Sequence, residues 1–221
     1  MTERDAPRRG ETRDTIDRTA IELFADRGYN ATSMRAIADA ARVQPAAIYH
    51  WYPGKEAILI RLQNDFMERL GKVVAAAVDT SDSPVLRLAA AVREHVVFHG
   101  LNTKAAFVTD REIRALSPGP RKSLIQRRDS YQQLFRQMIE EGIAEGSFSA
   151  SDSSVATYAI LLQCTGVALW YKSGGPLDLE RVGDLHVELV LNSLKAPPEM
   201  VETATGHRSI SIVESGEGRT G

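Results

Sequence analysis

Two histidines, His95 and His99, have a spacing that could do metal chemistry. Side chains four residues apart lie on one face of a helix, so both imidazoles could bind the same metal ion. No third ligand is suggested nearby, and the single cysteine, Cys164, cannot form an intrachain disulfide and fits a reducing cytoplasm. The chain also contains no nucleophile elbow, no phosphate-binding glycine loop and no Cys–His cluster. We therefore expect no metal site, no cofactor and no enzymatic activity.

The elements that must position any functional group are predicted to be helices. Apolar residues recur at helical spacing between Pro, Gly and Ser, and no convincing alternating strand pattern is present. The sequence therefore predicts an all-α fold of about nine helices. These helices are expected at about residues 11–27, 32–40, 45–52, 55–78, 84–99, 103–116, 120–145, 154–172 and 179–195.

The predicted helices divide the chain into two expected domains, one over residues 10–70 and a longer one over residues 71–196. Residues 197–221 are poor in large apolar side chains and rich in Gly, Ser, Thr and Glu, so we expect a disordered tail.

Residues 33–52 contain the parts of a helix-turn-helix. Thr32 can cap a short helix, and Gln44 can cap the next one, with Pro45 at its first position, where no amide hydrogen is missed. The second short helix has an exposed polar face. In a helix-turn-helix this second helix enters the major groove of DNA while the groups around it hold phosphates.

This segment resembles the DNA-binding motif of the TetR family of transcriptional regulators. The resemblance is confined to roughly the first quarter of the chain. The matching features are Leu23-Phe24 with Gly28-Tyr29, Ala31-Thr32-Ser33, Ile37-Ala38, Val43, Ile48-Tyr49-His50-Trp51-Tyr52 and Pro53-Gly54-Lys55-Glu56. The resemblance implies a homodimer in which residues 10–70 form a DNA-binding domain and residues 71–196 form a ligand-binding and dimerisation domain. A small effector bound in the second domain would control release from a palindromic operator.

The resemblance implies which side chains contact DNA. Those that would bind phosphates through hydroxyl, imidazole or ammonium groups are Thr32, Ser33, Tyr49, His50 and Lys55. Those that would face base edges are Gln44, Pro45, Ala46 and Ala47, where the amide could pair with adenine and the alanines could touch thymine methyls. Arg35 and Arg42 are further candidates for phosphate or base. Because Pro45 and the alanines offer few hydrogen bonds, DNA shape is expected to contribute to recognition.

Some residues of the motif have a structural alternative. Tyr52 is expected to be a core aromatic residue, Trp51 could be either core or functional, and Tyr49 is expected to be functional. Arg42 stands where the family commonly has glycine in the turn. A left-handed arginine costs roughly 1 kcal/mol, so either the turn differs here or the charge is useful.

The last two predicted helices are apolar on more than one face. In the last helix Val182, Leu185 and Leu189 form one stripe. The other stripe contains Val187, Val190, Leu191 and Leu194. A second apolar stripe implies a second partner, most simply the same helices of another subunit, and Ala159 and Gly166 would allow close approach. The alternative is a helix buried wholly within one chain. Paired reading heads also require a dimer, because half-sites lie about 34–36 Å apart.

The resemblance also implies a ligand pocket among the middle helices. The candidate lining residues are Phe66, Leu70, Val97, Phe98, Phe107, Leu134, Phe135, Met138, Leu162, Gly166 and Trp170, with His95, His99, Tyr131 and Gln163 as polar groups. Residues 170–177 also resemble a turn in actinobacterial TetR-type regulators of lipid or sterol breakdown, some of which sense acyl-CoA thioesters. If so, the arginines that could attract the CoA phosphates are Arg111, Arg114, Arg127 and Arg128.

Charge and hydropathy restrict these interpretations. The first sixty residues carry nine basic and nine acidic side chains, so a few positioned groups must hold the DNA. The stretch 153–171 could just span a membrane, but its Ser, Thr and Gln favour a buried helix and a cytoplasmic protein without membrane contact. The resemblance to the TetR family implies a repressor released by a small lipophilic effector. The alternatives are a regulator of efflux or another pathway that senses a free hydrophobic compound, and a ligand-blind helical scaffold.

Overall fold

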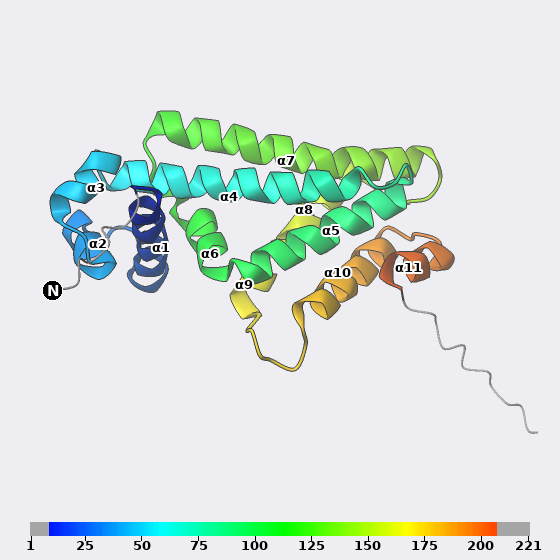
Figure 1. Ribbon diagram of the computed structural model, residues 1–221. Coiled ribbons are helices and arrows are strands. Elements are labelled where there is room, and N and C mark those ends of the chain that lie inside the picture. The colour runs from blue at the N-terminus through cyan, green and yellow to red at the C-terminus, as the bar shows by residue number, and fades with distance from the viewer. Residues whose placement is uncertain (1–8, 207–221) are drawn as a thin grey trace, which may run out of the picture.

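The computed structural model describes residues 9–206, and all regular secondary structure in this range is helical (Figure 1). The predicted all-α fold is therefore confirmed. The helices are α1 (Arg9–Arg27), α2 (Met34–Ala41), α3 (Pro45–Trp51), α4 (Lys55–Val78), α5 (Pro84–Leu101), α6 (Thr103–Arg111), the 3₁₀ helix η1 (Glu112–Ala115), α7 (Pro118–Ala144), α8 (Ser153–Thr165), α9 (Val167–Trp170), α10 (Leu179–Ser193) and α11 (Pro198–Thr205).

The long helix α4 belongs to two hydrophobic clusters. Its first half contributes Ile58 and Leu59 to an N-terminal cluster that holds α1, α2 and α3 together. Its second half contributes Leu70 and Val74 to a C-terminal cluster formed with α5, α7, α8 and α10. Figure 1 shows α1–α3 gathered at one end of the molecule, with α4 and α7 running side by side away from them. We call α1–α3 the reading head and α4–α11 the body. Helix α4 begins directly after the reading head and packs in both clusters, so it links the two.

The N-terminal cluster is closed by residues far along the chain. Val108 of α6, Leu116 after η1 and Leu124 of α7 are all buried in it, beside Phe24 and Ile37 of the head. Polar contacts join the same surfaces. The Tyr29 amide donates to the Glu112 carboxylate over 3.2 Å, the Ser117 amide donates to Glu56 over 2.6 Å, and Lys104 pairs with Glu22. The head is thus packed against α6, η1 and the start of α7.

Two predicted elements differ in the structure. The stretch expected as one helix over 154–172 is divided at Gly166 into α8 and α9, consistent with the low helix propensity of glycine. The helix expected over 103–116 ends at Arg111 and continues as η1. The other expected boundaries agree within two residues, which is the usual uncertainty of helix ends.

The expectation of disorder from residue 197 onward is wrong for its first part. Residues Pro198–Thr205 form α11, which packs against α10 and α5 through buried Val201. Arg93 donates to the Ala204 carbonyl over 2.6 Å and so satisfies a free carbonyl at the end of this helix. Helix α11 has only one buried residue, so its sequence shows little apolar periodicity, and its stability comes from packing against α10 and α5. Residues 207–221 lie outside the described part of the chain.

Candidate nucleic-acid interface and ligand cavity

The turn between α2 and α3 keeps left-handed geometry although an arginine occupies it. Arg42 has φ 56° and ψ 39° at the end of α2, and its side chain is exposed. The Val43 amide donates to the Ala38 carbonyl over 3.1 Å, which closes the end of α2 as glycine usually does. The turn therefore matches the geometry expected of the motif and adds a positive charge beside the reading helix.

The start of α3 presents the predicted base-reading residues to solvent. Gln44, Pro45 and Ala46 are exposed, and Ala47 is half-buried. Pro45 occupies the first helical position, as predicted. Gln44 occupies the N-cap position, as predicted, but its side chain makes no capping hydrogen bond, so its amide remains available to another partner.

The aromatic run of α3 divides into core and surface. Tyr52 is buried; its hydroxyl donates to Asp17 and accepts from Arg13 Nε at 3.2 Å, and burial raises its pKa to about 12. This confirms the expectation that Tyr52 is a core residue. Tyr49 is 58% exposed, and no residue in the described range 9–206 forms a hydrogen bond with its hydroxyl. Trp51 is half-buried under the Arg13 guanidinium, 5.7 Å from the ring centroid.

The structure places Thr32 and Ser33 differently. Thr32 is 2% exposed, and its hydroxyl donates to the Gly28 carbonyl over 2.9 Å, so this hydroxyl is not offered to a phosphate. The predicted cap by Thr32 is also wrong, because α2 begins at Met34 and Ser33 accepts from the Ala36 amide over 3.1 Å. Ser33 is exposed, and its hydroxyl hydrogen remains available to a phosphate.

Lys55 is half-buried at the start of α4, where it holds the loop after α1. Its ammonium donates to the Tyr29 carbonyl over 2.6 Å and lies 4.2 Å from the Tyr29 ring centroid, and burial lowers its pKa. The Tyr29 and Asn30 carbonyls accept two of its three N–H donors, which leaves one that could bind a phosphate. His50 is exposed, as is Arg35, which is 3.9 Å from Asp39 in a surface ion pair.

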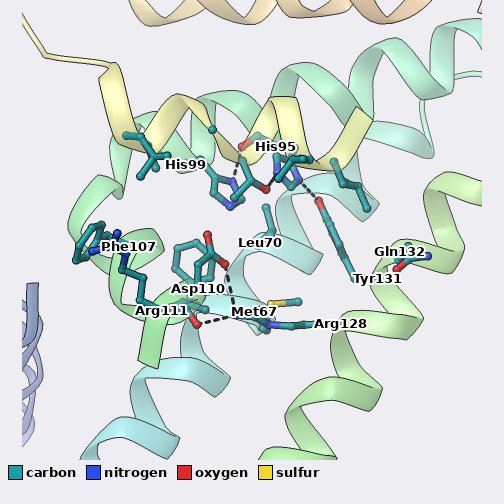
Figure 2. A pocket seen from close by; sticks show the side chains of 18 of the residues that line it. Met67, Leu70, His95, His99, Phe107, Asp110, Arg111, Arg128, Tyr131 and Gln132 are labelled. Carbon is teal, nitrogen blue, oxygen red and sulfur yellow. Dashed lines mark hydrogen bonds and ion pairs between the residues drawn. The ribbon is translucent and has the colours of Figure 1, made fainter. Parts of the chain in front are cut away.

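A cavity of about 510 Å³ lies in the body, between α4, α5, α6, α7, α8 and α9 (Figure 2). Its lining residues are Phe66, Met67, Leu70, His95, His99, Phe107, Thr109, Asp110, Arg111, Arg128, Tyr131, Gln132, Tyr158, Leu161, Leu162, Thr165, Gly166, Ala168 and Leu169. The volume suits a small organic molecule, and the wall is mostly apolar.

The structure brings together only part of the predicted lining. The predicted residues that line the cavity are Phe66, Leu70, His95, His99, Phe107, Arg111, Arg128, Tyr131, Leu162 and Gly166. Those that do not are Val97, Phe98, Arg114, Arg127, Leu134, Phe135, Met138, Gln163 and Trp170. Phe135 and Met138 are fully buried in the C-terminal cluster and Phe98 is almost so. Gln163 points to solvent, and Trp170 is half-exposed and stacked on His186.

Helical spacing could have found several lining residues that the sequence analysis missed. On α8 and α9 the cavity receives Tyr158, Leu161, Thr165 and Leu169, which recur three or four residues apart. This is the face marked by Leu162, one of the predicted residues. Met67 likewise lies beside Phe66. By the same spacing Asp110 follows the predicted Phe107 by three residues and Gln132 follows the predicted Arg128 by four, whereas Thr109 and Ala168 have no predicted lining residue three or four positions away.

The two histidines form a buried stacked pair on α5. Their ring centroids are 4.1 Å apart, and each side chain is 3% exposed. His95 Nδ1 lies 2.8 Å from the Tyr131 hydroxyl and His95 Nε2 lies 3.1 Å from the Thr165 hydroxyl. Burial lowers the pKa of His95 well below its usual value and that of His99 to about 4, so both rings are neutral near pH 7. Within residues 9–206, no group of three His, Cys, Asp or Glu side chains is arranged for a metal ion.

One end of the cavity is polar. Arg128 donates to the Thr109 carbonyl over 2.7 Å and lies 3.5 Å from Asp110, whose pKa burial raises. Arg111 is exposed, with its guanidinium 4.6 Å from the Phe107 ring centroid. Arg128 Nη2 is thus engaged with the protein, whereas Arg128 Nε is buried without a hydrogen-bond partner among the described residues. The guanidinium of Arg111 is open to a ligand.

The body has an exposed apolar surface on α8, α9 and α10. Its large apolar members, here called the apolar face, are Val155, Tyr158, Leu162, Leu169, Trp170 and Leu189. By length and composition alone, Ser153–Trp170 could also cross a membrane. Only 22% of this stretch is buried in the single chain, so the prediction of a buried helix is wrong for one chain by itself. Ala159 is exposed, Leu185 and Gly166 are half-buried, and Val182 is 2% exposed. The predicted stripe therefore loses Val182, which faces α5 and the core.

Two family models match the chain. The one described as "Bacterial regulatory proteins, tetR family" matches residues 16–62, which include α2 and α3. The one described as "Tetracyclin repressor-like, C-terminal domain" matches residues 81–194, just over half of the chain. Together they include the reading head and most of the cavity wall.

Relatives and solved structures agree with these models. The chain is 31% identical over 186 residues to the "HTH-type transcriptional repressor KstR2" of Mycolicibacterium smegmatis, covering 82% of this chain and 90% of that protein. A regulatory protein of the tetR family from Rhodococcus RHA1 superposes with TM-score 0.80 at 29% identity, over 85% of this chain and 98% of that chain. The structure of AibR in complex with isovaleryl coenzyme A and operator DNA superposes with TM-score 0.74 at 27% identity, over 82% and 97%.

These matches answer the question of function class. They identify a DNA-binding regulator of transcription rather than an enzyme, and they remove the ligand-blind scaffold as an alternative. The chain belongs to the TetR family of bacterial transcriptional regulators.

Proposed function

We propose that this regulator is a cytoplasmic homodimeric repressor that leaves a palindromic operator when a small lipophilic effector fills the cavity. The observation that carries the proposal is the double role of α4. Phe66, Met67 and Leu70 of this helix line the cavity, and the same helix begins at Lys55, four residues after the reading helix ends. A ligand that displaces this wall displaces the helix on which the reading head is mounted.

A second connection runs through α6. Phe107 and Arg111 line the cavity on this helix, and Glu112 directly after it accepts the Tyr29 amide of the head. The effector would thus act on α4 and α6 together. It can shift the equilibrium between DNA-bound and released forms only by its difference in affinity for the two.

The apolar face supports the homodimer. It exposes large side chains on α8, α9 and α10, including Leu162 at 76% and Leu189 at 60%. A soluble protein rarely leaves a contiguous apolar surface of this kind to water. A second copy packed on this face by a two-fold axis would cover it and would present two reading heads to successive turns of the groove.

An acyl-CoA thioester is the proposed effector. The apolar wall suits an acyl group, and the exposed Arg111 at the rim could hold a phosphate. The structural neighbour AibR was solved with isovaleryl coenzyme A and operator DNA, and the KstR2 relatives are transcriptional repressors. The alternative is a free hydrophobic compound, which would need no phosphate contact.

The test is fluorescence anisotropy of the protein's own upstream DNA during titration with acyl-CoA thioesters and the matching free acids. Release by a thioester but not by its acid is the expected result. Release by an acid alone would favour the free hydrophobic compound. If no upstream fragment binds, sites selected from random DNA replace it as the probe.

A matched pair of variants tests the position of the effector. Ala168→Trp adds an indole to the cavity wall, whereas Ala144→Trp adds one at the exposed end of α7, outside the cavity. We expect only Ala168→Trp to change the response to the releasing thioester. An unchanged response in Ala168→Trp, with normal DNA binding, would place the effector elsewhere.

A further inference from the structure

The hydrogen bond of His99 within α5 fixes which ring nitrogen carries its proton. His99 Nδ1 lies 2.8 Å from the backbone carbonyl oxygen of His95. A carbonyl oxygen can only accept a hydrogen bond, so Nδ1 must be the protonated nitrogen. In a neutral imidazole the other nitrogen, Nε2, then has a lone pair and no hydrogen, and can only accept.

The surroundings of the ring keep it neutral. His99 is 3% exposed, stacks on His95, and contacts Phe66 in an edge arrangement with ring centroids 5.4 Å apart. This burial lowers its pKa to about 4. Near pH 7 the imidazolium form, in which both nitrogens would donate, is therefore a minor species.

The lone pair of His99 Nε2 is open to the cavity. No group in the described part of the chain forms a hydrogen bond with Nε2. The atom is also not fully buried by protein atoms, so a ligand can reach it. His99 belongs to the cavity wall, and Figure 2 shows its ring reaching toward the cavity, with the Asp110 carboxylate across from it. The acceptor therefore has room for a partner that the protein does not provide.

The neighbouring groups do not offer that partner. Both ring nitrogens of His95 are occupied by the Tyr131 and Thr165 hydroxyls. Arg128 donates to the Thr109 carbonyl and lies beside Asp110. The Asp110 carboxylate is itself an acceptor when ionised. Arg128 Nε is a buried donor without a hydrogen-bond partner in the described part of the chain, but it does not bond to His99 Nε2, so that acceptor has no partner among these groups.

We propose that the effector carries a hydrogen-bond donor, a hydroxyl or an N–H group, which binds His99 Nε2 within the otherwise apolar cavity. The inference rests on the proposed function only in taking this cavity as the effector site. A plain hydrocarbon chain would cover Nε2 and leave a buried acceptor without a partner, which is costly. Sites that hydrogen-bond a ligand group discriminate strongly against the analogue that lacks it. His99 is therefore a specificity-determining residue that selects hydroxylated or N–H-bearing lipophilic molecules.

The tautomer is tested first on the free wild-type protein. NMR of protein labelled with ¹⁵N-histidine distinguishes a protonated ring nitrogen from an unprotonated one. His186 is an internal reference, because its Nδ1 also lies 2.8 Å from a backbone carbonyl, that of Val182, outside the cavity. We expect Nε2 of His99 to be unprotonated at pH 7, and a proton on Nε2 overturns the proposal.

Selectivity is tested with an isosteric pair of probes, 4-phenylphenol and 4-methylbiphenyl. They have nearly the same shape, but only the phenol can donate. We expect wild-type protein to bind the phenol about ten-fold more tightly in calorimetric titrations. His99→Phe keeps an aromatic ring against Phe66 and removes the acceptor, so the preference should fall to about one. The control His186→Phe changes a histidine outside the cavity and should keep the wild-type ratio.

The outcomes separate this inference from the proposed function. Equal affinity of wild-type protein for both probes, including no binding of either, overturns the donor requirement, as does a preference that survives in His99→Phe. A preference that depends on His99, in a protein whose DNA no thioester releases, supports the donor requirement and contradicts the thioester effector.

Discussion

The reading head and the ligand cavity are both formed by helices, but the head uses neighbouring residues whereas the cavity uses residues far apart in the chain. The head takes the exposed groups that are predicted to contact DNA from residues 33–55, on two short helices, their turn and the start of α4. The cavity takes its wall from six helices between Phe66 and Leu169, and each contributes a few side chains. The head is therefore fixed by local geometry, whereas the cavity exists only when the whole body is packed.

This difference indicates how one region can vary without the other. A substitution in the cavity wall changes the shape offered to a ligand but leaves Arg42 and the exposed start of α3 in place. The two regions still share α4, and they meet again where Glu112 holds the Tyr29 amide. Ligand specificity can thus change while the connection to the head is kept.

The largest expected effect tests the boundary between cavity and core. Phe135→Ala removes a fully buried ring from the C-terminal cluster and should lower the free energy of unfolding by about 3–5 kcal/mol. Phe107→Ala removes a half-buried ring from the cavity wall and should cost about 1 kcal/mol while changing effector affinity. Urea unfolding of both variants at one protein concentration provides the measurement. Similar losses would mean that Phe107 is a core residue as well.

The same pair of phenylalanines shows what the sequence could predict. Hydrophobic spacing predicts that both are inward-facing, but not whether an inward-facing ring meets protein atoms or a cavity. Phe135 meets other core side chains, and Phe107 meets the cavity and the Arg111 guanidinium. That distinction depends on how α6 and α7 are placed by residues far away in the chain, so the cavity could be predicted only in part.

The head was more predictable because its determinants are local. Pro45 at the first turn of α3 and Gly28 after α1, with φ 82°, act on their own neighbours, so the helix boundaries follow from the sequence. The hydroxyl of Thr32 was misassigned because its orientation depends on the Gly28 carbonyl, which a linear pattern does not place. Helix α11 was missed for the same reason, since its stability comes from contact with α10 and α5.

A second prediction asks whether the head depends on the distant apolar face. Leu189→Glu places a charge on the face without touching the cavity or the head. If the face joins two subunits, the variant should be monomeric and should lose about a hundred-fold in operator affinity, because two linked heads bind far better than one. Sedimentation velocity and DNA anisotropy measure the two effects.

The control for this variant is Ile125→Glu, a comparable change on α7 at a site 40% exposed and outside the apolar face. It should remain a dimer and keep the affinity. A Leu189→Glu protein that stays dimeric would exclude Leu189 from the subunit contact and would call for the same test at Val155 and Trp170, which also lie on the apolar face and outside the cavity wall.

A third prediction concerns how pH changes the free energy of unfolding through the buried histidines of the cavity wall. The pKa of His99 is lowered to about 4 in the folded chain, against about 6.5 when unfolded, so between these values the unfolded chain binds more protons. The free energy of unfolding should therefore fall as the pH falls, by about 2 kcal/mol from pH 7 to pH 5 for His99 alone. His99→Phe should lack this part of the loss, while His95, whose pKa burial also lowers, should still contribute a loss in the same direction. Parallel pH profiles for the two proteins would show that His99 titrates normally.

The smallest expected effect concerns the head itself and the role of a single hydroxyl. Tyr49 is 58% exposed near the end of α3, and its hydroxyl has no hydrogen-bond partner among the residues that the structure describes, so Tyr49→Phe should leave stability unchanged. If the hydroxyl donates to a phosphate, its loss should weaken DNA binding by about 1 kcal/mol, or roughly five-fold. The loss should be the same for every operator variant, because phosphates carry no sequence information. Anisotropy on a panel of single-base operator variants measures this. A uniform loss supports the phosphate contact, whereas a changed order of preference would show that Tyr49 faces base edges and that more of α3 reads sequence than Gln44, Pro45 and the alanines.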